Sequence, residues 1–317
     1  LTAKKYQLTF IAGVTMKVDD INFKFFHINK WDNGEFKGDA ISTTSELVKI
    51  SSDGNLGLEE GQKFERGGIY RFTVDVTKGN TKAVLTVEKV GKVDLPAPDI
   101  FFGNDKMEVT DTDIYKSEQV FTQGQMITVT GIDNLNEWWI DPDFFEKQSD
   151  GALKFLPING DYRVTANAVL KYFSVMALKD GKPAKLQDDG TGAIWAIGKG
   201  IGKPSVASSE VGWEPGKALC LAQVAPKKYQ LTLKAGETLK TSGDPEVISF
   251  KFFHQNDWGG EFGNYANSIL VEQLKLADSG NLEMQDNKAF EEGAVYRFTI
   301  DVTNGNANAD LKVEKIN

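Results

Sequence analysis

The sequence contains very few of the residues that catalytic and metal centres most often use. Its 317 residues include one cysteine, Cys220, and two histidines, His27 and His254. A single cysteine cannot form an intrachain disulfide, and its apolar setting, KALCLAQV, predicts a buried structural thiol. The histidines lie beside phenylalanines at the same position of two similar segments, so they are equivalents rather than partners. These absences argue against a histidine-based triad and against a His/Cys zinc site.

Long apolar runs and clusters of basic residues are also missing. No apolar stretch reaches the roughly 18–20 residues that are needed to span a bilayer. The chain opens at Leu1 with neither a basic nor an apolar leader, so we expect that any targeting segment has been removed. The formal net charge of −9 and the lack of a Lys/Arg cluster disfavour binding to nucleic acid.

Helical periodicity is absent over any three turns, whereas strand signals are frequent. Short runs of Phe, Val, Thr and Ile are separated by DG, NG, GG and KG pairs, which favours strands joined by tight turns. In YRFTVDV, Tyr70, Phe72 and Val74 share one face, which predicts a half-buried strand paired in a hairpin with KAVLTVEKV. We therefore predict an all-β chain of tandem immunoglobulin-like or carbohydrate-binding-module-like β-sandwich domains.

One module occurs at least twice, near the beginning and near the end of the chain. Repetition over this length indicates two copies of one folding unit. The matching stretches are KKYQLTFIAG (4–13) with KKYQLTLKAG (227–236), FKFFHINKWDNGEF (23–36) with FKFFHQNDWGGEF (250–262), and the segments 53–90 with 279–316.

Module boundaries follow from this repeat and from one proline-rich linker. The length of 317 residues suits two or three domains of about 100–150 residues each. DLPAPD at 94–99 stiffens a connection and stops strand pairing, so it marks a boundary. We predict module A at 1–93, a divergent module B at 94–190 and module C at 191–317.

Two further expectations concern modules A and B. From Ala193 onward, 34 residues precede KKYQL in module C, but only three precede it in module A, so module A is expected to lack its first strands. In module B, FTQGQMITVTGI (121–132) resembles the KKYQLT strand, and GDYRVTANAVLKYFSVMAL (160–178) resembles the closing hairpin. Module B is therefore interpreted as a diverged third copy.

The segment NEWWIDPDFF at 136–145 is absent from modules A and C and contains two candidate carboxylates. Asp141 and Asp143 flank Pro142, which favours a solvated turn. Two alternatives are a calcium-ligating loop and the carboxylate pair of a glycoside hydrolase. The glycine-rich GKGIGKP at 198–204 lacks the GK[ST] ending of a phosphate-binding loop and is expected to form a turn. We expect no catalytic residue, metal or cofactor.

The tryptophans are the strongest candidates for ligand binding. Most lie beside Gly, Asn or Asp, where an indole face can stack on a sugar ring while polar neighbours bind its hydroxyls. The alternative is an indole that covers the open end of a sandwich core, and both interpretations stay open for Trp31 and Trp258. Trp195 lies in the apolar run AIWAI and is expected in the core. The six tryptophans are Trp31, Trp138, Trp139, Trp195, Trp213 and Trp258.

An ordered series of motifs carries a resemblance to a known family. The series runs through AIWAIGKGIGKP, VGWEPGKALCLA, KKYQLTLKAG, FKFFHQNDWGGEF, SGNLEM and GAVYRFTIDV. It resembles the modules of the SusE/SusF family of starch-utilisation outer-membrane lipoproteins. Module C matches throughout, and module A matches from its second strand onward. The resemblance implies tandem, non-catalytic β-sandwich modules at the cell surface, held in the outer membrane by a lipid anchor upstream of Leu1, beside an outer-membrane transporter.

The resemblance also implies which residues contact a polysaccharide or oligosaccharide. Family members bind glycan through aromatic platforms flanked by polar side chains. Trp138 and Trp139 lie outside the resemblance and are candidates because of their polar loop. The alternative function is a structural scaffold of a glycan transporter, without a sugar site of its own. The positions that match the family's binding residues are Trp258, Asn256, Glu261 and Tyr265 in module C and Trp31, Asn29 and Glu35 in module A.

Overall fold

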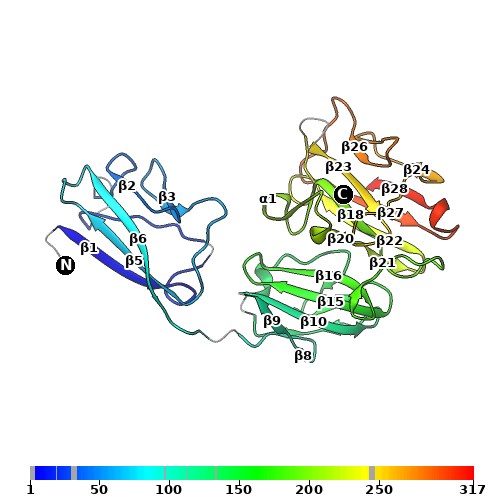
Figure 1. Cartoon of the computed structure of the whole chain (residues 1–317), viewed down its shortest axis with the longest axis horizontal. Helices are drawn as coiled ribbons and strands as arrows, with labels where there is room; N and C mark the ends of the chain where they lie inside the picture. Colours follow the sequence, from blue (N-terminus) through cyan, green and yellow to red (C-terminus); the bar gives the residue numbers. More distant parts are fainter. Residues whose placement is uncertain are drawn as a thin grey trace. The chain divides into compact units, whose positions relative to one another are not determined.

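A computed structural model describes residues 4–18, 20–29, 34–95, 98–111, 113–132, 134–242 and 247–317 (Figure 1). The chain divides into two compact units, Leu1–Ala97 and Pro98–Asn317, and the division lies inside the DLPAPD segment. Within the described ranges, no helix is long and apolar enough to cross a membrane. The predicted all-β architecture of tandem sandwiches is confirmed. The helical elements are α1 (Val206–Ser209), η1 (Leu135–Glu137), η2 (Pro215–Lys217) and η4 (Asn306–Asn308).

The first unit packs a four-stranded sheet against a small hairpin sheet. The four strands have the order β1-β5-β6-β2, in which β2 runs parallel to β6 and the other pairs are antiparallel. β3 and β4 form the second sheet, and an isolated bridge joins Phe23 to Leu56 of β4. The strands are β1 (Lys5–Ile11), β2 (Ile41–Thr43), β3 (Val48–Ile50), β4 (Leu56–Leu58), β5 (Gly68–Asp75) and β6 (Ala83–Lys92).

The hairpin of β5 and β6 confirms the alternation expected from the sequence. Tyr70, Phe72 and Val74 are buried, and the residues between them are half-buried on the opposite face. Phe72 contacts Phe10, Phe23 and Phe64 in tilted or edge-to-face geometry. Aromatic pairs of this kind add about 0.5–1.5 kcal/mol beyond the burial of their area. The first unit therefore has its own aromatic core.

The first half of the second unit contains one five-stranded sheet and two three-stranded sheets. Their orders are β17-β16-β15-β10-β9, β11-β14-β13 and β12-β7-β8. The strands are β7 (Phe101–Phe102), β8 (Asp105–Lys106), β9 (Glu108–Asp111), β10 (Ile114–Phe121), β11 (Met126–Ile127), β12 (Val129–Thr130), β13 (Phe145–Lys147), β14 (Leu153–Phe155), β15 (Gly160–Asn167), β16 (Tyr172–Lys179) and β17 (Lys182–Pro183).

The expected equivalence between 121–132 and the KKYQLT strand is wrong. The strand that pairs with β15 is β10, which ends at Phe121. The chain then turns at Gly124, whose φ is 82°, and continues as β11 and β12 in two other sheets. The apolar residues of 121–132 therefore alternate without forming one strand, because this turn interrupts them.

The second half of the second unit is a sandwich of a six-stranded and a five-stranded sheet. The larger sheet has the order β19-β18-β23-β26-β25 with β20 also paired to β18, and the smaller has the order β21-β22-β27-β28-β24. The strands are β18 (Trp195–Gly202), β19 (Glu210–Gly212), β20 (Leu219–Cys220), β21 (Ala222–Ala225), β22 (Lys228–Lys234), β23 (Ser249–Phe253), β24 (Asn267–Ile269), β25 (Leu274–Leu276), β26 (Leu282–Met284), β27 (Val295–Asp301) and β28 (Asp310–Lys315).

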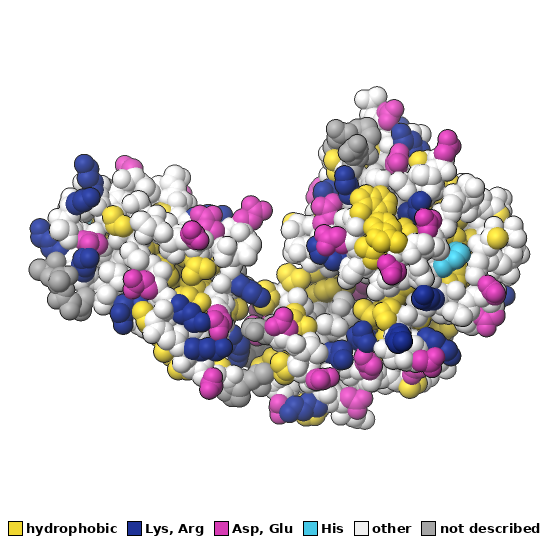
Figure 2. Space-filling view, in the orientation of Figure 1, with side chains coloured by type: hydrophobic (Ala, Val, Ile, Leu, Met, Phe, Trp, Pro, Cys, Tyr) yellow, Lys and Arg dark blue, Asp and Glu magenta, His cyan; other side chains and the backbone are white. Residues whose placement is uncertain are grey.

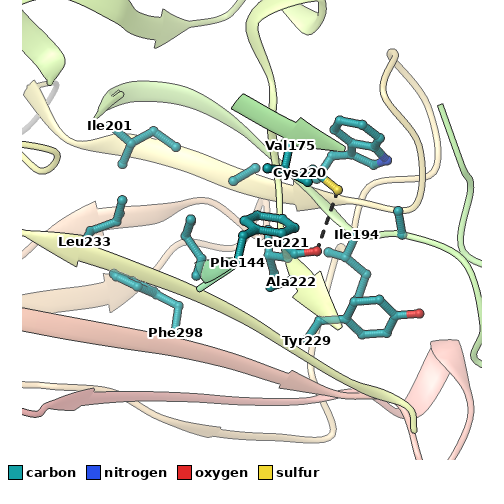
Figure 3. Close-up of a cluster of buried hydrophobic side chains, with 14 of the residues drawn as sticks. Phe144, Val175, Ile194, Ile201, Cys220, Leu221, Ala222, Tyr229, Leu233 and Phe298 are labelled. Carbon is teal, nitrogen blue, oxygen red and sulfur yellow. Dashed lines mark hydrogen bonds between the residues drawn. The ribbon is translucent and has the colours of Figure 1, made fainter. Parts of the chain in front are cut away.

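One hydrophobic cluster runs through both halves of the second unit. Phe144 and Val175 from the first half belong to the same cluster as Ile194 and Leu233 from the second (Figure 3). Cys220 is also buried there, with its thiol 3.6 Å from the Leu221 carbonyl oxygen, so the predicted structural thiol is confirmed. The shared cluster makes the two halves one cohesive body.

Candidate functional site

Asp141 and Asp143 are buried where the two halves of the second unit meet. Lys203 Nζ lies 2.7 Å from Asp141 Oδ2 and 3.1 Å from Asp143 Oδ2, and the three side chains are at most 3% exposed. Asp143 also accepts hydrogen bonds from the Thr232 amide (2.6 Å), the Thr232 hydroxyl (2.6 Å) and the Gln230 side chain (2.7 Å). The expected turn forms, since the Phe144 and Phe145 amides donate to the Asp141 carbonyl oxygen. Its expected solvation is wrong, because both carboxylates are buried against Lys203 and β22.

The ion pairs determine the protonation of this triad. Burial raises the pKa of Asp141, and the neighbouring Asp143 adds to this effect while Lys203 opposes it. Burial also disfavours the charge of Asp143, but Lys203, Thr232 and Gln230 outweigh burial and lower its pKa. The pKa of Lys203 is raised because two carboxylates outweigh the cost of its burial. Lys203 thus supplies the positive charge that a calcium ion would supply. The described residues contain no group of three or more His, Cys, Asp or Glu that could hold a metal ion.

The glycines that precede Lys203 lie inside β18, so the expected turn at 198–204 is also wrong. A Cβ atom at Gly198 would lie 2.3 Å from Phe250 Cα, and one at Gly202 would lie 2.4 Å from the Ser209 carbonyl oxygen. Gly198 has a φ of 143°, which a larger residue rarely adopts. These glycines let neighbouring strands approach closely and bring Lys203 to the carboxylates.

A cleft of about 540 Å³ lies beside the triad, between β16 and the segment from α1 to β20. Asp141, Tyr172, Ser174, Ser208 and Lys217 are among its lining residues, but Asp143 is not. A glycoside hydrolase needs two carboxyl groups facing one cleft at about 5–10 Å. Of the predicted pair only Asp141 borders the cleft, and it is ion-paired with Lys203. Glu210, which also lines the cleft, is ion-paired with Lys240, so this geometry does not favour hydrolysis.

Trp138 and Trp139 pack inside the second unit. Trp138 is 7% exposed and stacks on Phe173 with a ring separation of 4.6 Å. The half-buried Trp139 donates a 2.6 Å hydrogen bond from Nε1 to Glu237 and contacts Tyr172 edge-to-face. Trp138 is therefore a core residue rather than a platform, and Trp139 links the two halves. Asp141 and Asp143, which follow them in NEWWIDPDFF, are buried too.

Trp258 and Trp213 form an exposed aromatic pair at the second copy of the repeat. Trp258 is 51% exposed, and its ring is 6.2 Å from the half-buried Trp213 ring at an interplanar angle of 25°. The ring of the buried Phe253 contacts the Trp258 ring edge-to-face, with the ring centroids 6.0 Å apart. Figure 2 shows hydrophobic side chains gathered on the surface of this unit. The nearly parallel rings offer the flat apolar surface that a sugar ring requires.

The loop that carries Trp258 is held by its own hydrogen bonds. Gln255 donates from Nε2 to the Trp258 carbonyl oxygen at 2.6 Å, and Asp257 Oδ1 accepts from the Trp258 amide at 2.7 Å. The His254 amide donates to Gly260 O at 2.6 Å, and Gly259 and Gly260 have φ values of 81° and 68°. The two glycines close the turn, so the indole position is fixed by backbone geometry.

Two polar atoms of the same loop are enclosed by the protein. Within the part of the chain that the structure describes, His254 Nε2 and Asn256 Oδ1 are buried without a hydrogen-bond partner. Burial lowers the pKa of His254, against a smaller opposing effect of Glu261, so the ring is neutral at pH 7. Both atoms are therefore part of the interior of the loop rather than of its surface.

The other two predicted residues of this module lie differently. Glu261 is exposed, and its backbone pairs with Phe253 next to the aromatic pair. Tyr265 is largely buried and stacks on Phe262 at an interplanar angle of 11°. Its hydroxyl has no partner among the described residues, and burial raises its pKa. Glu261 can therefore contact a ligand directly, whereas Tyr265 supports the loop from inside.

A polar hollow adjoins Trp213. It has a volume of about 670 Å³, and Gly212 and Glu214, the sequence neighbours of Trp213, are among its lining residues. Lys217 pairs with Glu214 at 3.0 Å, and Lys240 pairs with Glu210 at 2.9 Å. The hollow adjoins Trp213 only through these two neighbours in sequence, because the Trp213 ring is not among its lining residues.

The first copy of the site is only partly described. Trp31 lies outside the described residues. Asn29 is exposed, and Glu35 is half-buried with its backbone bridged to Phe26. The Glu35 pKa is lowered, chiefly by its own backbone amide. The described residues of the first unit do not assemble a second aromatic pair of the Trp213–Trp258 kind.

Comparison with known families identifies the repeated module. Residues 1–77 and 189–303, more than half of the chain, match the family described as Domain of unknown function (DUF5121). The chain belongs to the DUF5121 family. Residues 93–186 match a different family, described as Domain of unknown function (DUF5125). A search of curated proteins gave no match. The two DUF5121 stretches contain the repeat, while the region expected to be a diverged third copy matches the separate DUF5125 family.

The sequence analysis neither pairs Trp213 with Trp258 nor places Lys203 beside Asp141 and Asp143. Trp213 was grouped with the other tryptophans and not paired with Trp258, which lies 45 positions away in the sequence. Lys203 was assigned to a turn. The Gly-Trp dipeptide at 212–213 is a sequence signal that could identify Trp213, since Gly212 has a φ of 57° directly before it. No local sequence pattern pairs Lys203 with Asp141, because Lys203 directly follows β18 whereas Asp141 lies in the segment before β13.

Proposed function

We propose that this chain is a non-catalytic carbohydrate-binding protein and that Trp258 and Trp213 form its glycan platform. The observation that carries the proposal is the half-exposed Trp258 ring lying nearly parallel to Trp213. An exposed indole costs free energy in water unless it has a partner to cover it. A pyranose ring covers it with C–H groups while its hydroxyls face outward.

The polar surroundings fit this ligand class better than a charged one. The exposed Glu261 offers acceptor oxygens near the rings, and the charged residues around the hollow at Gly212 and Glu214 pair with one another. The net charge of −9 disfavours polyanions. A neutral polysaccharide or oligosaccharide is the ligand that these groups favour.

Cell-surface location extends the proposal and rests on the resemblance to SusE/SusF modules. Under this extended proposal, the protein is a lipid-anchored outer-membrane component that holds polysaccharide beside a transporter. Weak sites on tandem modules then combine, because a polymer bound at one site has a high effective concentration at the next. The alternative is a transporter-associated scaffold without a sugar site.

Affinity electrophoresis tests the platform directly. Native gels containing amylopectin, xyloglucan, galactomannan or xylan should retard the wild-type chain with at least one polymer. Trp258→Ala and Trp213→Ala should each weaken binding by about tenfold, which corresponds to about 1.4 kcal/mol. Trp139→Phe is the matched control, since it changes an indole outside the platform and should bind normally.

Three readouts separate the alternatives. The melting temperature of Trp258→Ala should stay within about 2 °C of wild type, because an exposed side chain contributes little to the core. A scaffold predicts no retardation by any polymer together with co-purification of an outer-membrane transporter. Release of reducing sugar that disappears in Asp141→Asn or Asp143→Asn would contradict the non-catalytic part of the proposal.

A further inference from the structure

Among the described residues, the two DUF5121 copies share one set of strands, and the second copy has further strands that extend both of its sheets. β1, β5, β6 and β2 of the first unit have the same order and directions as β22, β27, β28 and β24. β3 and β4 correspond to β25 and β26. In the second copy, β18, β19, β20 and β21 complete the two sheets. The described part of the first unit has no counterpart of these four strands.

The first consequence is an uncovered edge at β1. In the second copy β21 pairs with β22, and Tyr229 and Leu231 of β22 are fully buried. Their counterparts in the first unit, Tyr6 and Leu8, are 66% and 49% exposed. Because the two strands share the sequence KKYQLT, composition cannot explain the difference. The neighbouring segment explains it.

The second consequence is a strand that does not form. FKFF at 250–253 lies in β23, where Phe252 and Phe253 pair with β18. The identical FKFF at 23–26 makes only two isolated bridges, at Phe23 and Phe26. Phe253 is 2% exposed, whereas Phe26 is 36% exposed. The same residues become a buried strand only where β18 lies beside them.

The third consequence is a hollow of about 270 Å³ on the first unit. Tyr6, Phe25, His27, Val76 and Asn80 are among its lining residues. In the second copy the counterparts of three of these residues contact the opening segment of the module. Tyr229 Oη donates to Gly190 O at 3.1 Å, the Leu186 amide donates to His254 O at 2.8 Å, and Asn306 Nδ2 donates to Gln187 O at 3.0 Å.

We propose that this open face of the first unit is a strand-acceptor site. Its occupant is an opening segment of the DUF5121 type, the counterpart of residues 186–225. The segment enters antiparallel beside Phe23–Phe26 as β18 does beside β23, and its second strand pairs with β1 as β21 does with β22. Main-chain hydrogen bonds supply the affinity of such strand addition, and side-chain pockets supply its specificity.

The geometry also defines the chemistry of the occupant. β18 presents Ala196, Ile197 and Ile201 to the core, and all three are completely buried. Gly198 permits an approach that any larger residue would block, since its Cβ would lie 2.3 Å from Phe250 Cα. The acceptor therefore requires a small, apolar strand with glycine opposite Phe23, and it rejects a charged or bulky one.

The test joins residues 186–226 of this chain to Lys4 in the full-length protein, which reproduces the spacing found before Lys227. Hydrogen exchange is then measured by mass spectrometry over residues 5–11 and 21–27. Exchange in both stretches should slow by at least about tenfold, since opening then requires separation of paired strands. The matched control carries the equivalents of Gly198→Val and Ile197→Asp in the added segment and should give no such protection.

Three outcomes overturn the proposal. Unchanged exchange in both stretches means that the face does not accept this segment. Equal protection by the native and altered segments means that the effect is not specific strand addition. The third outcome comes from sedimentation of the unmodified chain. A concentration-dependent dimer that the Leu8→Lys substitution dissociates would show that a second copy occupies this face. Glycan binding through Trp258 is independent of every outcome.

Discussion

At the scale of single residues, exposure separates the tryptophans of the second unit into different roles. Trp195 is completely buried and donates from Nε1 to the Ala184 carbonyl oxygen at 3.0 Å, which confirms its expected place in the core. Trp138 is also in the core, while Trp258 is half-exposed. All of these residues have the same chemistry, so their environment decides which can meet a ligand.

The thiol of Cys220 provides a residue-scale prediction. Burial raises the pKa of Cys220 to about 12, so almost none of it is thiolate at pH 8. A disulfide reagent such as DTNB should therefore not react with the native protein over an hour at pH 8. In 6 M guanidinium chloride one thiol per chain should react within minutes. Rapid reaction without denaturant would show that the region around β20 opens readily.

Gly198 provides a second prediction at this scale. Gly198→Ala should destabilise the second unit by about 2 kcal/mol or more, because the added methyl group meets the backbone of Phe250 and the φ of 143° disfavours a side chain. Gly216→Ala is the control, since nothing lies within 4 Å of its added Cβ. Urea unfolding of both variants gives the comparison, and equal midpoints would refute the close-approach argument.

At the scale of elements, the Lys203 triad joins NEWWIDPDFF to the end of β18 and to β22. Lys203→Met should destabilise the second unit by about 3–5 kcal/mol, because it leaves two buried carboxylates without a counter-charge. Lys217→Met removes an exposed partner of Glu214 and should change the stability by less than about 0.5 kcal/mol. Thermal and urea unfolding of the two variants test this contrast.

The pH dependence of that loss has a definite sign. Without Lys203, the folded-state pKa values of Asp141 and Asp143 rise above those of the unfolded chain, so the folded variant takes up protons as the pH falls. Proton uptake relieves the uncompensated charge and stabilises the variant. The stability difference from wild type should therefore be larger at pH 8 than at pH 5. A larger difference at pH 5 would show that the carboxylates are already protonated in the wild type.

At the scale of the whole molecule, each unit has its own core and the division falls in DLPAPD. A fragment of residues 98–317 should therefore keep the melting temperature of the second unit and the glycan retardation of the full chain. The first unit, with its uncovered β1 edge, should melt at the lower temperature in calorimetry of the full chain. A single cooperative transition, or a fragment that does not fold, would contradict the independence of the two cores.

Much of the fold could be predicted from local pattern. The alternation in YRFTVDV depends only on neighbours two residues apart, and a strand half-buried in a sandwich must obey it. The repeat required no structural knowledge, since two stretches of the same sequence encode the same strands. The candidate site was predicted less well. The sequence singled out Trp258 but predicted neither its pairing with Trp213 nor the burial of Trp138 and Asp141.

The sequence by itself determined that this chain is all-β and that one module recurs. Only the tertiary structure decided that Asp141 and Asp143 are buried around Lys203 and that Trp213 lies beside Trp258. It alone decided that the identical FKFF segments differ in burial. The physical reason is that each of these outcomes depends on a partner distant in the sequence, whose approach no local periodicity records.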